Sequence, residues 1–234
     1  MTDAEKILKS MAMAGVEWEI GDSGPGVRNP ESGIRIPNPE FRAPKPAAPV
    51  SADGIMEIAA RRAAGPDIIT AIKGFAEHPL FAGAKNTVVP FAVRAGARLL
   101  VVTDMPSLVD DVCGNILSGA EGDLFDKMIG AIGLVRGDIA ITPLVFWRPA
   151  GGRTPTADEL RFCRPFVDRV IAETAAERIL TLGALAAKEI AGAALPRDHG
   201  KLFGNVIPIY KPDFIMRNPG VKQDVWKALK LIAN

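Results

Sequence analysis

The sequence predicts an α/β fold: a three-layer α/β/α sandwich around a central four-stranded, mostly parallel sheet. Four short runs rich in aliphatic residues fit strands, at 99–102, 139–145, 178–182 and 206–210. Segments with helical spacing separate these runs, and strands that alternate with helices are typical of a parallel sheet covered on both faces. The chain has 234 residues and 48% hydrophobic content, enough for one domain with a core, plus tails.

Three parts follow one another along the chain. Residues 1–20 place Ile7, Leu8 and Met11 at mostly helical spacing, which predicts a short amphipathic helix. This helix either packs on the main domain or serves as a docking segment for a protein partner. Residues 21–50 are rich in proline and glycine and lack periodicity, which indicates a linker. Residues 51–234 are expected to form the α/β domain.

Local signals predict the elements of the domain in order. Ser51 is placed to cap a first helix, and a second short helix follows at 66–76. The strand at 99–102 ends at Thr103 and Asp104, and Pro106 breaks it into an acidic loop. A helix at 123–132, closed by Gly133, precedes the second strand.

Pro143 interrupts the second predicted strand. Because proline removes a ladder donor, this strand must end near Pro143 or lie at an edge of the sheet. Thr156 and Glu159 then form a capping box at the start of a long helix. The last two predicted helices run from Gly183 to Ile190 and over 221–232.

The composition excludes several classes of protein. The formal net charge is +1, so contact with a nucleic acid would need a local basic cluster rather than a global field. The two cysteines lie far apart and no signal peptide is evident, so we expect a reduced, cytoplasmic location. No segment approaches the roughly 20 apolar residues of a membrane-spanning helix, and no membrane association is expected.

Asp104 is the first candidate for chemistry. It follows the first strand directly, and in open α/β sheets the functional side chains converge at the carboxyl ends of the strands. An aspartate at this position also fits a simple structural role as the cap of a following helix or turn. The stretch alone leaves both interpretations open.

Several segments together resemble the family 4 uracil-DNA glycosylases. The segment TDMPS at 103–107 stands where the family has GEAPG, and GNILSG around Leu117 where it has GRPFVG. The segment ITP ending at Pro143 stands for ITN, and YKP around Lys211 for YHP. Residues around these motifs also match the family in order, from about residue 75 to the end, which implies the same fold. They include Arg148, Pro149, Arg153, Gly183 and Pro212.

The resemblance implies a role for each motif position. Such enzymes flip a damaged nucleotide out of the duplex, bind its base in a pocket and hydrolyse the glycosidic bond. Asp104 corresponds to the carboxylate that orients the attacking water, and Lys211 to the histidine that stabilises the leaving base. The base pocket is expected to comprise Thr103, Met105, Pro106, Ser107, Leu117 and Pro143.

Three of the four motif positions, Leu117, Pro143 and Lys211, differ in chemical type from the family. Leu117 replaces an aromatic ring, and stacking on such a ring is worth about 1 to 3 kcal/mol per base. Pro143 replaces the asparagine that recognises the base and has no side-chain donor. For DNA contact the resemblance points to Arg148, Arg153, Arg217 and Asn218.

The family also carries an iron–sulfur cluster on four cysteines. The corresponding residues here are Phe75, His78, Trp147 and Cys163. A cluster needs thiolate ligands, and one thiol with one imidazole does not hold it. We therefore expect no iron–sulfur cluster, no other cofactor and no metal site.

Three functions remain open from the sequence. The first is a DNA-binding superfamily member, linked to base-excision repair on single-stranded or damaged duplex DNA, with lost or much reduced uracil excision. The second is an active glycosylase, a hydrolase with altered base preference that uses Asp104 and Lys211. The third is a non-catalytic module that recruits a protein partner through residues 1–20.

Overall fold

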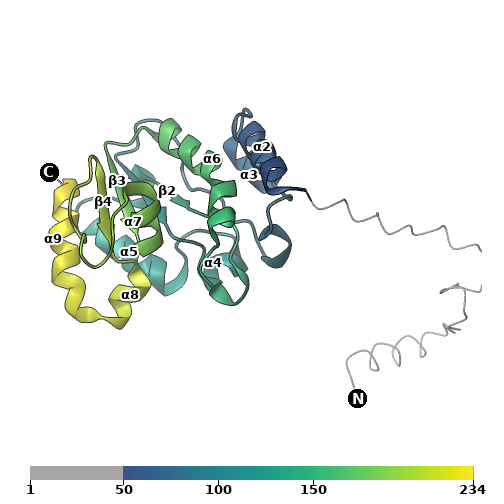
Figure 1. The fold of residues 1–234 in the computed structure, drawn as a ribbon. Helices are drawn as coiled ribbons and strands as arrows, with labels where there is room; N and C mark the ends of the chain where they lie inside the picture. The colour runs from purple at the N-terminus through teal and green to yellow at the C-terminus, as the bar shows by residue number, and fades with distance from the viewer. Residues whose placement is uncertain (1–49, 234) are drawn as a thin grey trace, which may run out of the picture. The chain divides into compact units, whose positions relative to one another are not determined.

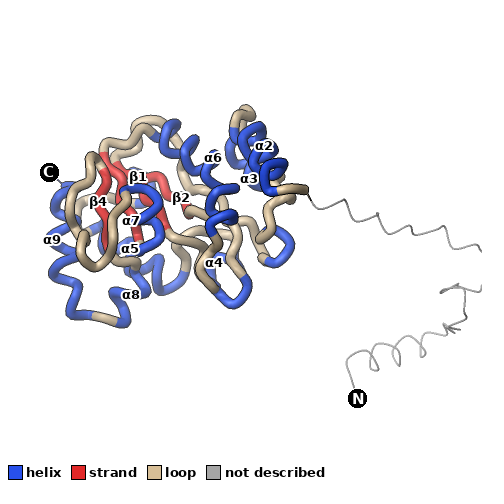
Figure 2. Tube along the Cα trace, in the orientation of Figure 1, coloured by secondary structure: helices blue, strands red, loops and turns tan. Residues whose placement is uncertain are grey.

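A computed structural model describes residues 50–233, so the predicted helix at 1–20 and nearly all of the predicted linker lie outside the described residues. The described part contains a four-stranded sheet in the order β2-β1-β3-β4, with every pair of neighbouring strands parallel. Figure 2 shows this sheet enclosed by helices. The four strands are β1 (Leu99–Thr103), β2 (Ile139–Pro143), β3 (Arg178–Leu182) and β4 (Val206–Ile209).

Helices connect the strands and complete the chain (Figure 1). They are α2 (Ala52–Ala63), α3 (Ile68–Lys73), α4 (Leu108–Cys113), α5 (Gly119–Gly130), α6 (Ala157–Thr174), α7 (Ala184–Ala191), α8 (Pro212–Arg217) and α9 (Lys222–Ala233). None of the helices in residues 50–233 has the length and apolar character needed to cross a membrane.

The sheet has a hydrophobic core on each face, because successive strand side chains point in opposite directions. Leu100 and Val102 of β1 pack with buried residues of α2, α3 and α6. Leu99 and Val101 pack on the other face with buried residues of α5, α8 and α9. The predicted three-layer α/β/α sandwich is therefore confirmed.

The register aligns the ends of the strands. Thr103 pairs with Pro143 on one side and with Leu182 on the other, and Leu182 pairs with Ile209. The residues that follow β1, β3 and β4 consequently emerge at one edge of the sheet. Pro143 is the last residue of β2, which is also an edge strand, so both consequences expected of this proline occur.

Two helices start as the capping signals predict. The Ser51 side chain accepts a hydrogen bond from the Gly54 N–H, and Thr156 and Glu159 form the reciprocal capping box of α6. Helix α7 begins directly after Gly183.

Several elements differ from the prediction, among them the shorter helix α3 and strand β2. The stretch after Pro106 is helix α4 rather than a loop, because Ser107 and Asp110 form a capping box that starts a helix there. The helix predicted at 123–132 begins earlier and ends earlier, spanning Gly119–Gly130. Helix α8, with Pro212 in its first turn, was not predicted.

Candidate functional site

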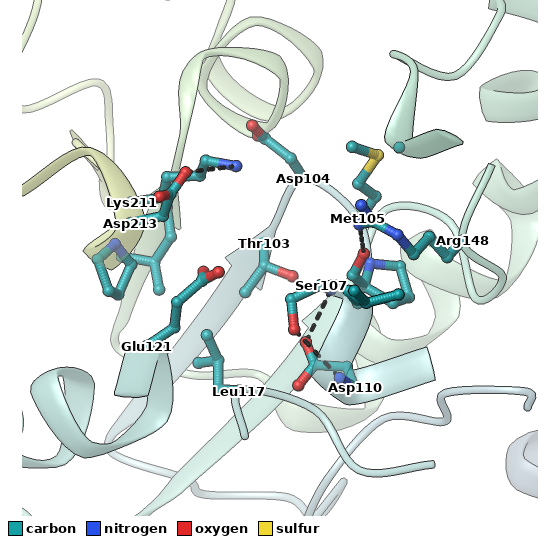
Figure 3. Close-up of a pocket in the computed structure, with 15 residues that line it drawn as sticks. Thr103, Asp104, Met105, Ser107, Asp110, Leu117, Glu121, Arg148, Lys211 and Asp213 are labelled. Carbon is teal, nitrogen blue, oxygen red and sulfur yellow. Dashed lines mark hydrogen bonds and ion pairs between the residues drawn. The ribbon is translucent and has the colours of Figure 1, made fainter. Parts of the chain in front are cut away.

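A cavity of about 340 Å³ opens at the carboxyl edge of the sheet (Figure 3). Its walls come from the end of β1, from α4, from the first turn of α5, and from the loops after β2 and β4. The lining residues are Thr103, Asp104, Met105, Pro106, Ser107, Leu108, Asp110, Leu117, Glu121, Arg148, Gly152, Leu182, Lys211, Pro212 and Asp213.

Asp104 belongs to this wall and also serves a helix. Its Oδ1 accepts a hydrogen bond of 2.7 Å from the Ala186 N–H in the first turn of α7. Gly183 makes this approach possible, since a Cβ at position 183 would lie 2.2 Å from the Asp104 Oδ2. Asp104 therefore does act as a helix-terminus acceptor, although it serves α7 and not the helix that follows it in sequence.

Burial dominates the electrostatics of Asp104. Desolvation raises the pKa of this carboxyl above its usual value, while the Ala186 N–H and the charge of Lys211 partly oppose the rise. Lys211 thus acts on Asp104 from the end of β4, which is separated from β1 by β3. The two groups that the sequence paired for chemistry are electrostatically coupled in the fold.

Lys211 precedes α8 and has a second acidic neighbour. Its Nζ lies 3.7 Å from the Asp213 carboxylate. Asp213 also forms an ion pair with Arg217, one turn further along α8. The Lys211 ammonium makes no hydrogen bond within residues 50–233, so its donors remain available to a bound molecule.

Asp110 is a structural residue of the cavity wall. Its carboxylate accepts hydrogen bonds from the backbone N–H groups of Ser107, at 3.0 Å, and Ser118, at 2.7 Å. It therefore joins the start of α4 to the segment before α5. Beside it, the Arg148 guanidinium donates a 2.9 Å hydrogen bond to the Pro106 carbonyl oxygen.

The predicted site residues divide into two groups. Those that line the cavity are Thr103, Asp104, Met105, Pro106, Ser107, Leu117, Arg148 and Lys211. Those outside its lining are Pro143, Arg153, Arg217 and Asn218.

The residues outside the lining have local partners or are buried. Arg153 forms a two-pronged ion pair with Glu159, with distances of 2.8 and 2.6 Å. The Asn218 side-chain amide donates to the Phe214 carbonyl oxygen. Pro143 is buried in the sheet.

Sequence reasoning missed three acidic residues of the cavity. They are Asp110, Glu121 and Asp213. The spacing of Ser107 and Asp110 fits a capping box, so Asp110 had a usable local signal. No local pattern marks Glu121, because its place depends on how α5 packs after Leu117.

Comparison with known proteins assigns the family. The model of the Uracil DNA glycosylase superfamily matches residues 90–230, which include β1 to β4 and the whole cavity lining. The chain belongs to this superfamily. The expected fold and the resemblance are thereby confirmed at the level of the superfamily.

Curated relatives of the superfamily match the chain over most of their own length. A Type-4 uracil-DNA glycosylase from Pyrobaculum aerophilum is 28% identical over 174 residues, 68% of this chain and 88% of the relative. One from Archaeoglobus fulgidus is 27% identical over 162 residues, 63% of this chain and 81% of the relative. One from Thermotoga maritima is 28% identical over 171 residues, which is 66% of this chain and 87% of the relative.

The four positions that the resemblance aligns with the cluster cysteines of the family 4 enzymes do meet in space. Phe75 and Trp147 have ring centroids 6.1 Å apart, and His78 stacks on Trp147 at 4.7 Å. The Cys163 Sγ lies 3.4 Å from the His78 Nε2. All four side chains are buried.

The chemistry of this group does not fit an iron–sulfur cluster. Aromatic rings fill two of the ligand positions, and burial raises the pKa of the Cys163 thiol, which disfavours the thiolate. The His78 Nδ1 accepts from the Leu80 N–H, so its Nε2 donates to the Glu159 carbonyl oxygen. Residues 50–233 contain no group of three or more His, Cys, Asp or Glu side chains suited to a metal ion.

Proposed function

We propose that this chain binds DNA and accommodates an extruded base in the cavity at Asp104, with uracil excision lost or much reduced. The relatives it matches are named as uracil-DNA glycosylases, which act on an extruded nucleotide. A volume of about 340 Å³ is in the range of small-molecule pockets. The cavity lies where ligands of open α/β sheets bind, at the carboxyl ends of the strands.

The observation that carries the loss of uracil excision is the chemistry at Pro143 and Leu117. Pro143 has no side-chain donor and is absent from the cavity lining, so no amide from this strand recognises a uracil edge. Leu117 offers apolar contact without an aromatic face. Both changes weaken uracil binding while leaving space for a base.

Local cations supply the expected DNA contact, since the net charge of +1 supplies none. Arg148 lies in the cavity wall, and about half of the Arg153 side chain is exposed. Guanidinium groups suit phosphate oxygens because their donors form a planar fork. Binding through such contacts weakens as salt rises, because it releases counterions from the DNA.

DNA affinity as a function of salt tests this proposal. We expect the wild type to bind single-stranded or mismatched DNA in a salt-sensitive manner in fluorescence anisotropy. Arg148→Ala should reduce the slope of log K against log salt by about 1, and Arg153→Ala should also weaken binding. Arg98→Ala is the matched control, since Arg98 is exposed and precedes β1 at the opposite edge of the sheet.

Absent or salt-insensitive binding would contradict this function. The remaining interpretation would be a module that recruits a protein partner through residues 1–20. That role stays a prediction, because these residues lie outside the described part of the chain.

A second function, hydrolysis of a different base, is favoured by the pairing of Asp104 and Lys211 in one cavity. In this scheme Asp104 orients the attacking water, and the Lys211 ammonium stabilises the leaving base. A base-release assay on oligonucleotides carrying uracil, hypoxanthine, xanthine and alkylated bases tests it. Release that disappears in Asp104→Asn would support catalysis, and release that is unchanged would exclude this role for Asp104.

A further inference from the structure

Glu121 differs from every other carboxylate of the cavity in having no hydrogen-bond partner within residues 50–233. Asp104 accepts from α7, Asp110 accepts from two backbone N–H groups, and Asp213 pairs with Arg217. Figure 3 shows the Glu121 carboxylate directed into the cavity from the α5 side. It is therefore the carboxylate most available to a bound molecule.

The backbone around Glu121 is firmly held. Glu121 lies in the first turn of α5, and a Cβ at the next residue, Gly122, would lie 2.0 Å from the Leu117 carbonyl oxygen. Only glycine permits so close an approach of the helix to the preceding turn. The Arg136 guanidinium donates to the same Leu117 oxygen and to the Ile116 oxygen, which fixes this turn. Such support is what a binding side chain needs for a defined position.

The charges around Glu121 come from both walls of the cavity. Lys211 and Arg148 favour its ionised form, while Asp213 and Asp110 disfavour it. Burial has the largest effect and raises the pKa of the Glu121 carboxyl. A partly buried carboxylate of this kind gains from a ligand that supplies N–H donors.

We propose that Glu121 recognises the edge of the extruded base and selects bases with an exocyclic amino group over uracil. An ionised carboxylate accepts hydrogen bonds and donates none. Cytosine, adenine and guanine each carry an amino donor. Uracil carries a carbonyl oxygen at the ring position where cytosine carries its amino group, so a carboxylate oxygen placed to accept from that amino group would face the uracil carbonyl oxygen.

This inference rests on the proposed function and gives it a substrate class. Pro143 supplies no side-chain donor to a base. Glu121 instead supplies a hydrogen-bond acceptor, from the α5 wall of the cavity. Lys211 and Arg148 remain available for the acceptor atoms of the same nucleotide. The pocket would then differ from a uracil pocket in the base that it prefers, as well as in its affinity for uracil.

Cytosine and uracil provide a matched pair of probes, because they differ by an amino group against a carbonyl on a pyrimidine ring. We would measure the affinity of the full chain for two duplexes that carry one unpaired cytosine or one unpaired uracil at the same position. Work at about pH 8, far above the ordinary pKa of a glutamate, favours the ionised carboxylate. The wild type should prefer the cytosine duplex by roughly tenfold.

The variants separate recognition from folding. Glu121→Gln keeps the size of the side chain and exchanges one hydrogen-bond acceptor for a donor. The affinities for the cytosine and uracil duplexes should then lie within about twofold of each other. Asp123→Asn removes one charge from an exposed position of the same helix and should keep the wild-type ratio. A merely structural role of Glu121 would change both affinities by the same factor and leave the ratio intact.

The remaining outcomes separate the role of Glu121 in base selection from the proposed binding of DNA. Wild-type binding with equal affinity for both duplexes, or a full preference retained by Glu121→Gln, would overturn the role of Glu121 alone. Absence of wild-type binding to either duplex would overturn the proposed DNA binding and this inference with it.

Discussion

Asp104 illustrates how one side chain serves both structure and a candidate reaction. Its position after β1 predicted a functional carboxylate and a helix cap as alternatives. The structure places the carboxyl in the cavity wall and also bonds it to the Ala186 N–H. The same residue therefore supports the start of α7 and forms part of the cavity wall.

Removing the charge of Asp104 has a predictable effect on stability. Because burial raises the pKa of this carboxyl, the folded protein binds its proton more tightly than the unfolded chain does. Its contribution to the free energy of unfolding therefore falls as pH rises through the pKa range of the group. Asp104→Asn removes this titration and keeps an acceptor for Ala186.

Thermal unfolding at two pH values measures this effect. We expect the Tm of Asp104→Asn, relative to wild type, to be higher at about pH 8 than at about pH 4. The exposed Asp123→Asn is the control and should show a smaller change. A relative Tm of Asp104→Asn that falls as pH rises would contradict the burial of an ionised carboxylate at this position.

At the scale of elements, the turn between β3 and α7 depends on a glycine. Gly183 has φ 112° and ψ 167°, a conformation that side chains rarely adopt, and it lies against the Asp104 carboxylate. Gly192 at the other end of α7 also has a positive φ, of 64°, but faces open space. Gly183 therefore combines a backbone conformation that is nearly restricted to glycine with a close approach to Asp104, whereas Gly192 has only the milder left-handed conformation.

Alanine substitution distinguishes these costs. Gly183→Ala should lower the free energy of unfolding by roughly 1 to 3 kcal/mol more than Gly192→Ala, because it drives a Cβ into Asp104 and also has the less tolerant backbone conformation. Urea denaturation measures both values. Equal losses for the two variants would contradict both the close approach of Gly183 to Asp104 and the strain of its backbone.

The start of α4 offers a second test at this scale. Asp110 is buried and joins two backbone N–H groups, whereas Ser107 supplies a single cap acceptor. We expect Ser107→Ala to cost about 1 kcal/mol and Asp110→Ala to cost more, since it leaves two donors unsatisfied. Midpoints of urea unfolding give the comparison, and the reverse order would contradict this account of α4.

For the whole molecule, strand order along the chain, capping signals and Pro143 were sufficient to predict the layers of the fold. Local patterns of this kind specify elements because caps and strand breaks act within a few residues. The position of Glu121 was not predictable in this way. It depends on the contact of Gly122 with the Leu117 backbone and on Arg136, which is distant in sequence.

A prediction about the whole protein follows from the buried cluster of Phe75, His78, Trp147 and Cys163. Hydrophobic packing takes the place that a cluster has in the family that the sequence resembles, so folding should not require iron. The purified protein should lack the visible absorbance of an iron–sulfur cluster, and an iron chelator should leave its Tm unchanged. Stoichiometric iron, or a chelator-dependent loss of Tm, would contradict this expectation.

The central claim is that the cavity beside Asp104 receives a base extruded from DNA. The most direct test uses a duplex with one mismatched 2-aminopurine, whose fluorescence rises when the base leaves the stack. We predict that saturating wild-type protein increases this fluorescence, in parallel with binding measured by anisotropy. Full binding without any change in 2-aminopurine fluorescence would contradict the claim, since the base would then remain stacked in the duplex.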